Sequence, residues 1–148
     1  TQLVGEKENA KQYVIDDFAH NPSEVAAAIA ACQLISPRVI AYFQPHGFGP
    51  LRFMHAELSQ EVAKVLRPND YFLIGDVYYA GGTVDRNISP TIVSTAIIRE
   101  GKQAHYVGNK QGALTEMITL AQENTTFLIM GARDPHLDQL AKDLLKRL

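Results

Sequence analysis

The stretch VIDDFAHNP, residues 14–22, decides how this chain folds. It opens on an apolar run typical of a strand and closes on an Asn-Pro pair. Asn21 is a favoured N-cap residue, Pro22 suits the first helical position, and Glu24 completes the pattern of a helix start. Apolar residues then recur at helical spacing, namely Val25, Ala28, Ile29 and Cys32. The stretch therefore predicts a strand that passes within a few residues into a helix.

The same alternation continues to the end of the chain. Further strands are predicted at residues 38–43, 71–74, 104–107 and 126–130. Further helices are predicted at residues 51–66, from Ser89-Pro90 with Ile92, Val93, Ala96 and Ile97 inward, around Leu114, Ile118 and Ala121, and from Asp134-Pro135. Strand-like runs near residues 3–4 and 13–15 flank a polar connection, which indicates a hairpin. This order predicts an α/β fold of three αβα layers, with a mainly parallel sheet and an N-terminal hairpin or edge strand.

Length and composition favour one globular domain. The chain has 148 residues, of which 46% are hydrophobic and 20% charged, and its formal net charge is -2. Because no basic stripe runs along the sequence, we expect neither nucleic acid nor an anionic membrane surface as a partner. No apolar stretch has the roughly 20 residues of a membrane span, and the first residues do not resemble a signal peptide.

The single Cys32 cannot form an intramolecular disulfide, so we expect it to be a small helical core residue in a protein of the reducing cytoplasm. The chain begins at Thr1 with strand-like residues and no initiator Met. We therefore expect it to be an excised piece of a longer protein.

Polar and glycine-rich sequences follow four of the predicted strands. They occupy residues 16–20, 44–49, 75–82 and 131–134. Ligands of parallel α/β sheets bind beyond the carboxyl ends of the strands, so this edge is predicted to bind a small anionic or polyhydroxylated ligand. Loops of this kind are polar in many proteins, but four loops biased the same way favour a real site. The opposite ends of the strands, at Ser36-Pro37 and residues 67–70, have the sequences of plain turns.

Several kinds of chemistry are not expected from these residues. His20, His46, His55, Asp16, Asp17 and Asp76 could gather, but they lack the spacing of a metal motif, so no protein metal cage is predicted. His55 is expected on a helix flank, and His105 and His136 at the surface. A GxSxG elbow is absent and Cys32 has no activating neighbour in sequence, so no covalent catalysis is expected. A GxxxxGK[ST] motif is absent as well, so any bound phosphate must be held by isolated backbone N–H groups or from outside this chain.

Three ordered motifs resemble those of one enzyme family. VIDDFAHNPSEVAAAI, residues 14–29, resembles the start of the C-terminal domain of the Mur ligases, which are ATP-dependent enzymes that attach amino acids or peptides to UDP-N-acetylmuramate. FQPH at residues 43–46 and DVYYAG at residues 76–81 resemble the UDP-N-acetylmuramate:L-alanine ligase branch. MGARDP at residues 130–135 lies where that branch carries a Gly-Ala-Gly loop. The resemblance covers essentially the whole chain.

The resemblance implies that residues 1–148 are the Rossmann-like third domain of a cytoplasmic ligase of peptidoglycan synthesis or recycling. ATP and Mg²⁺ would be held mainly by a central domain with the P-loop, and this domain would close over ATP and present the amine substrate. It would have no ligase activity by itself. The implied nucleotide-binding residues are Asp16, Asp17, His20 and Asn21, and which aspartate contacts the sugar stays open. The implied substrate-binding residues are His46, Arg52, Asp76, Tyr78 and Arg133, and no residue is implied to be catalytic or to bind metal.

The chain also departs from the alanine-adding branch. After QPH that branch usually continues with an arginine-rich run, whereas here residues 47–52 read GFGPLR and only Arg52 remains. DDFAH at residues 16–20 also resembles the branch that ligates the tripeptide L-alanyl-γ-D-glutamyl-meso-diaminopimelate, but that branch usually has Glu-Pro-Arg-Ser where this chain has QPHG. We favour an alanine-ligase-like protein. The tripeptide ligase is the first alternative and a divergent family member of altered substrate the next. A nucleotide-binding module without catalysis is an alternative of another class, and a purely structural role for Asp16, Asp17 and His20 is the simplest competing interpretation.

Overall fold

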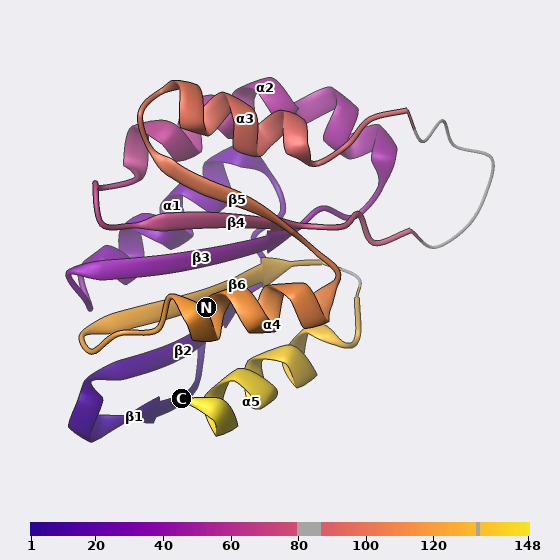
Figure 1. Cartoon of the computed structure of the whole chain (residues 1–148). Helices are drawn as coiled ribbons and strands as arrows, with labels where there is room; N and C mark the ends of the chain where they lie inside the picture. Colours follow the sequence, from indigo (N-terminus) through magenta and orange to yellow (C-terminus); the bar gives the residue numbers. More distant parts are fainter. Residues whose placement is uncertain (80–86, 133) are drawn as a thin grey trace.

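The computed structural model describes residues 1–79, 87–132 and 134–148 of the chain. Strands and helices alternate after an N-terminal hairpin, as predicted (Figure 1). The strands are β1 (Gln2–Lys7), β2 (Gln12–Asp17), β3 (Arg38–Gln44), β4 (Tyr71–Gly75), β5 (Gln103–Gly108) and β6 (Thr125–Gly131). The α-helices are α1 (Pro22–Gln33), α2 (Phe48–Val65), α3 (Thr91–Arg99), α4 (Lys110–Thr119) and α5 (Leu137–Arg147), and a short 3-10 turn (Glu8–Ala10) joins β1 to β2.

The strands form a six-stranded sheet in the order β1-β2-β6-β3-β4-β5. Only β1 is antiparallel to its neighbour, so the predicted mainly parallel sheet with an N-terminal edge strand is confirmed. Strand β6 is the last in sequence but pairs with β2 on one side and with β3 on the other. Phe127 aligns with Val14 across one pairing and with Ile40 across the other.

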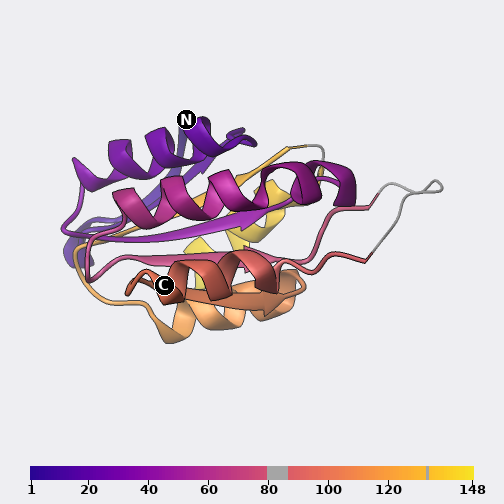
Figure 2. The same ribbon diagram turned by 90° about the horizontal axis from the view of Figure 1, so that it is seen from above.

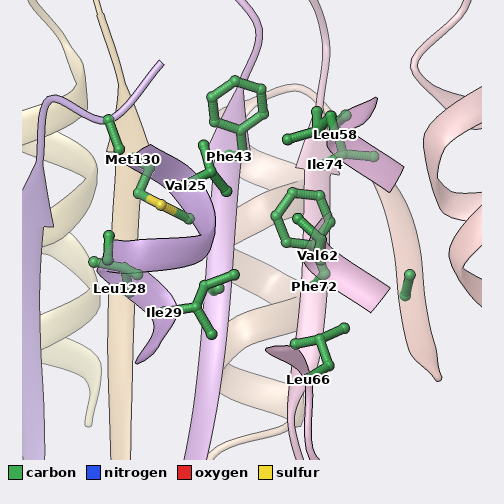
Figure 3. Packing of buried hydrophobic residues seen from close by; sticks show 14 of the residues in the cluster. Val25, Ile29, Phe43, Leu58, Val62, Leu66, Phe72, Ile74, Leu128 and Met130 are labelled. Atoms are coloured by element: carbon green, nitrogen blue, oxygen red, sulfur yellow. The ribbon is translucent and has the colours of Figure 1, made fainter. Parts of the chain in front are cut away.

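Helices cover both faces of the sheet and give the three layers (Figures 1 and 2). One hydrophobic cluster joins α1, α2 and α3 to the first face, where Phe43 and Phe72 stack with ring centroids 6.4 Å apart (Figure 3). A second cluster joins α4 and α5 to the other face. Successive residues of β3 alternate between the two clusters: Val39, Ala41 and Phe43 belong to the first, Ile40 and Tyr42 to the second.

The helices fit the sequence prediction, with differences at the start of α2, on the buried face of α3 and at the start of α5. Helix α1 begins as predicted, with the Asn21 side chain accepting a hydrogen bond from the Glu24 N–H. Helix α2 begins at Phe48 rather than at Leu51. Helix α3 buries Val93 and Ile97, but the prediction for Ile92 is wrong, because this side chain is 40% exposed. Helix α5 begins at Leu137 rather than at Asp134-Pro135, since Asp134 first forms a turn by accepting a hydrogen bond from the His136 N–H.

The turn at residues 67–70 is more than the plain turn that was expected. The Asp70 side chain is fully buried and accepts hydrogen bonds from the Val39 N–H (2.8 Å), from Gln33 Nε2 (2.9 Å) and from the Arg67 guanidinium (3.0 Å from Nε). Burial would raise the pKa of Asp70, but these bonds hold it below its usual range. The carboxylate thus ties the ends of α1 and α2 to the start of β3, at the edge opposite the predicted site.

Phe43 and Phe53 give a direct test of the core, because one is buried and the other is exposed. Phe43 is 0% exposed and Phe53 is 92% exposed. We expect Phe43→Ala to lower the free energy of unfolding by about 3–5 kcal/mol, because it leaves a cavity in the first cluster. The control Phe53→Ala should change it by less than about 0.5 kcal/mol. Urea denaturation measures both, and equal losses would contradict this assignment of the core.

A pH series tests the Asp70 network. Because the folded pKa of Asp70 lies below its unfolded value, its stabilisation is present above about pH 4 and is lost as the pH falls through the folded pKa. Asp70→Asn should cost about 3 kcal/mol or more at pH 7, and the gap to the parent chain should narrow below about pH 4. Glu8→Gln, at an exposed acid of the hairpin turn, is the control. A gap that stays constant with pH would show that the charge of Asp70 is not responsible.

Candidate functional site

The carboxyl edge of the sheet opens where β6 lies between β2 and β3. The helices that follow β2 and β3 pack on one face, whereas α5 follows β6 on the other face. Neighbouring loops therefore leave the edge in opposite directions, which is the arrangement that creates a ligand crevice in open α/β sheets. Gly131 closes β6 at φ 154°, and a Cβ there would lie 2.8 Å from Leu137 and 3.2 Å from the Gln44 carbonyl oxygen. The chain turns here in a space that only glycine fits.

Asp16 and Asp17 end β2 and line a hollow of 320 Å³. The other residues that line it are Phe18, Ile129, Gly131, Asp134, Pro135, Leu137 and Asp138. Their environments differ. Burial would raise the pKa of Asp17, but hydrogen bonds from the Thr1 hydroxyl and from the Ala19 N–H (2.8 Å) hold it below its usual range. Burial raises the pKa of Asp16, and the charge of Asp17 adds to this. The Asp17 carboxylate is thus engaged by hydrogen bonds from Ala19 and Thr1, whereas for Asp16 the effect of burial on the pKa outweighs a hydrogen bond from its own backbone.

His20, Asn21 and His46 line a second hollow of 400 Å³, between the starts of α1 and α2. The two histidine rings meet edge to face with centroids 5.5 Å apart, and His20 Nδ1 lies 3.0 Å from the Phe18 carbonyl oxygen and 3.2 Å from Glu24 Oε1. The Asn21 side chain is engaged as the helix cap, since its Oδ1 accepts from the Glu24 N–H at 3.0 Å. The other lining residues are Pro22, Ser23, Pro50, Phe53, Met54 and Glu57.

Asp76 and Tyr78 line a third hollow of 160 Å³, between the ends of β3 and β4 and the start of α4. The backbone fixes both residues: the Asp76 N–H donates to the Gly108 carbonyl oxygen (2.8 Å) and the Tyr78 N–H to the Pro45 carbonyl oxygen (2.7 Å). The Tyr106 hydroxyl donates to the Asp76 carboxylate, which raises the pKa of Tyr106.

Sequence reasoning missed the ion pair at the centre of this edge. Lys110 Nζ lies 2.6 Å from Oδ2 of Asp134, whose side chain is fully buried. Burial would raise the pKa of Asp134, but the bonds from Lys110, from the His136 N–H and from Gln44 hold it below its usual range. Asn109 caps α4 by accepting from the Gly112 N–H at 2.9 Å, so Asn109-Lys110 is a strand-to-helix junction like the four that were singled out. Applying the same rule to the end of β5 would have found it.

The predicted site residues do not share one pocket. Asp16 and Asp17 line the first hollow, His20, Asn21 and His46 the second, and Asp76 and Tyr78 the third. Arg52 is an exposed residue of α2 that lines none of these three hollows. Arg133 and residues 80–81 of the DVYYAG motif lie outside the described residues. Among the described residues, the predicted site residues are thus divided among three separate hollows.

The remaining candidate residues have structural positions. Cys32 is buried in α1, and burial raises its pKa to about 12, which confirms it as a core residue.

Among residues 1–79, 87–132 and 134–148, histidines, cysteine and acids form no group of three or more that could hold a metal ion. Within the same described part of the chain, no helix has the length and apolar character that crossing a membrane requires.

A mainly parallel six-stranded sheet covered by helices on both faces, with hollows along its carboxyl edge, defines the class: a Rossmann-like α/β domain. Residues 1–133 match the profile of a family described as Mur ligase, glutamate ligase domain, and the chain belongs to this family. It is 34% identical to a UDP-N-acetylmuramate–L-alanine ligase of Pelotomaculum thermopropionicum over 99% of the chain, and 37% identical to one of Chloroflexus aggregans over 82%. The chain spans 31% and 25% of the lengths of these two relatives.

Two solved structures of proteins named as UDP-N-acetylmuramate ligases have the same fold as this chain. The UDP-N-acetylmuramate-alanine ligase of Thermotoga maritima matches 98% of this chain with TM-score 0.68 and 23% identity, over 28% of its own length. A domain from a putative UDP-N-acetylmuramate:tripeptide ligase of Haemophilus ducreyi matches 93% of this chain with TM-score 0.63 and 21% identity, over 91% of its own length. The resemblance to the Mur ligases that the motifs indicated is confirmed.

The Lys110–Asp134 pair can be tested by removing one partner and then both. We expect Lys110→Met to lower the free energy of unfolding by about 1–3 kcal/mol, because it leaves a buried carboxylate without its cation. Adding Asp134→Asn should recover part of that loss, which a double-mutant cycle measures as coupling. Lys64→Met, at a 75% exposed lysine paired with Glu61, is the matched control and should change stability by less than about 0.5 kcal/mol. Additive effects of the two site substitutions would contradict the pair.

Proposed function

We propose that this chain is the C-terminal domain of a longer, ATP-dependent, ADP-forming ligase that joins L-alanine to UDP-N-acetylmuramate in peptidoglycan synthesis in the cytoplasm. The observation that carries the proposal is the 34% identity over 99% of the chain to a relative named for that reaction. Since the chain spans 31% of that relative, the remaining parts of the ligase would supply what this domain lacks. These are the P-loop and the main ligands of ATP and Mg²⁺.

Binding of the nucleotide is assigned to the junction between β2 and α1. Asp16 is our choice for the contact to the nucleotide sugar, because Asp17 is already held by the Ala19 N–H. A carboxylate at this place can accept two sugar hydroxyl groups. His20 is 47% exposed and held at Nδ1 by its own loop, so its other ring nitrogen is available to a phosphate or sugar oxygen. Asn21 contributes by fixing the start of α1, whose positive end favours a phosphate.

Binding of the other substrates is assigned to the β3 and β4 loops, with His46, Arg52, Asp76, Tyr78 and, outside the described residues, Arg133. No residue of this set is proposed to carry out acid–base or covalent chemistry. The domain's contribution is orientation: it brings the amine to the activated carboxylate and closes the site, effects that supply much of the rate in two-substrate reactions. The chain lacks the arginine run, and Pro50, Phe53 and Met54 line the hollow beside His46. Fewer charged side chains are therefore present here to bind an anionic group of the substrate.

The relatives favour alanine over the tripeptide as the substrate. The two relatives described above, at 34% and 37% identity, both carry the alanine-ligase name. The solved structures that carry the tripeptide-ligase or murein peptide ligase name are 21% and 16% identical to this chain, which supports the fold only. Both relatives described above are named as ligases, which favours a ligase over a nucleotide-binding module without catalysis.

Substitution of His20 in the longer protein tests the proposal. We expect His20→Ala to lower kcat/KM for ATP-dependent amide synthesis by about 10- to 100-fold, the loss of one hydrogen bond to a charged group. The melting temperature should stay unchanged, because the His20 side chain is half exposed. His105→Ala, at a histidine that contacts Glu116 and Tyr71 instead of the hollows, is the control. Full activity of the His20 variant, or an equal loss in the His105 variant, would argue against the proposed nucleotide site.

A further inference from the structure

We propose that Tyr106 of β5 is a positioning residue, whose hydroxyl group holds the Asp76 carboxylate in the orientation in which Asp76 contacts the substrate. The inference rests on the proposed function for one step, the assignment of Asp76 to substrate binding. The contact between the two side chains rests on the structure alone. Sequence analysis assigned no role to Tyr106, which lies inside a predicted strand and 30 residues from Asp76.

The side chain of Asp76 is held by a direct bond. The hydroxyl group of Tyr106 donates a hydrogen bond to Oδ1 of Asp76. Asp76 is the first residue after β4 and is exposed, so without this bond its side chain could change rotamer freely. The bond also raises the pKa of Tyr106 and is the main reason for that rise, as expected when a phenol donates to a carboxylate. Strand β5 thus fixes an acid on the loop that follows its neighbour.

The main chain of Asp76 is held by the same strand. Its N–H donates to the carbonyl oxygen of Gly108 at 2.8 Å. Gly108 and Tyr106 lie two residues apart on β5, so one short segment bonds both the backbone and the side chain of Asp76. A side chain fixed in this way loses less conformational freedom when a ligand binds, which is the basis of preorganisation.

A β-bulge lies at the same place. The register of β4 and β5 slips after the pair Ile74 and Tyr106, which leaves Val107 as an extra residue on β5. Gly108 follows with a φ of 72°, in the left-handed region that favours glycine. Bulges bend a strand and redirect its side chains, and they are common beside functional sites. We attribute to this bulge the approach of both Tyr106 and the Gly108 carbonyl group to Asp76.

Tyr106 acts through Asp76 rather than on the substrate. Asp76 lines the third hollow, whereas Tyr106 is not among the described residues that line it. The bond engages Oδ1, and because each oxygen of a carboxylate can accept, Oδ2 can still bind a donor group of the substrate. Loss of the Tyr106 hydroxyl should therefore leave the binding group in place and remove only its orientation.

Tyrosine titration in the 148-residue chain tests the contact independently of any activity. A related domain that matches this chain over 91% of its own length has been crystallised by itself. We expect Asp76→Asn to lower the pKa of Tyr106 toward the ordinary value of a tyrosine, because it removes the negative charge that the hydroxyl group faces. NMR of isotope-labelled tyrosine rings follows this change, and the signals of Tyr13 on β2 are the internal control. An unchanged Tyr106 titration would overturn the contact.

Kinetics of the longer protein test the role. We expect Tyr106→Phe to raise the KM for L-alanine about 3- to 10-fold, the effect of one misplaced hydrogen bond. The KM for ATP should not change, because the nucleotide is assigned to the junction of β2 and α1. Tyr13→Phe is the matched control and should leave both KM values unchanged. The melting temperature should stay within about 2 °C of the parent, since Tyr106 is 42% exposed.

Combining two substitutions shows whether Tyr106 acts through Asp76. In the Asp76→Asn background, Tyr106→Phe should raise the KM for L-alanine no further, since the carboxylate that it orients is already absent. A further rise there, an equal rise in the KM for ATP, or no rise in the parent protein would overturn the inference. If amide synthesis persists in these cases, only the positioning role is wrong. If the longer protein forms no amide bond at all, the proposed function fails, and the titration of Tyr106 in the 148-residue chain still decides the contact.

Discussion

Strand β6 pairs with β2 through six residue pairs and with β3 through seven, and the rest of the structure depends on this double pairing. All seven of its residues are buried, and apart from Thr125 and Thr126 the strand is without polar side chains, as expected for the centre of a parallel sheet. Its position sends α5 to the face opposite α1 and α2, and this divergence opens the carboxyl edge. Asp134, which follows β6, then lies close enough to bond both Gln44 at the end of β3 and Lys110 after β5.

The sequence predicted where the helices and strands lie along the chain better than it predicted which of them are neighbours in the fold. The start of α1 was secure because its signals, from Asn21 to Glu24, act within one turn. The insertion of β6 between β2 and β3 could not be predicted, since the run TFLIM would suit any buried place in the sheet. For the same reason the partners of Asp70 and Asp134 were missed: Asp70 meets Gln33 and Val39, and Asp134 meets Lys110, across long stretches of chain. The prediction that Ile92 points inward was wrong, because the sequence does not show which face of a helix an apolar residue at its start occupies.

The three hollows differ in the chemical groups that line them. Acids and a helix start line the first two, where Asp16 and His20 suit the polar groups of a nucleotide. A buried amide, a carboxylate and a lysine line the third. The proposed function assigns the binding and alignment of two substrates to these groups, and it assigns the phosphate chemistry to the rest of the ligase.

ATP turnover by the 148-residue chain, compared with the longer protein that carries it, tests the central claim most directly. The account predicts that the isolated chain neither hydrolyses ATP nor forms an amide bond, while the longer protein releases ADP as it joins L-alanine to UDP-N-acetylmuramate. Hydrolysis of ATP or amide synthesis by the isolated chain would contradict it, because the chain would then contain the catalytic groups that the account assigns to the rest of the ligase.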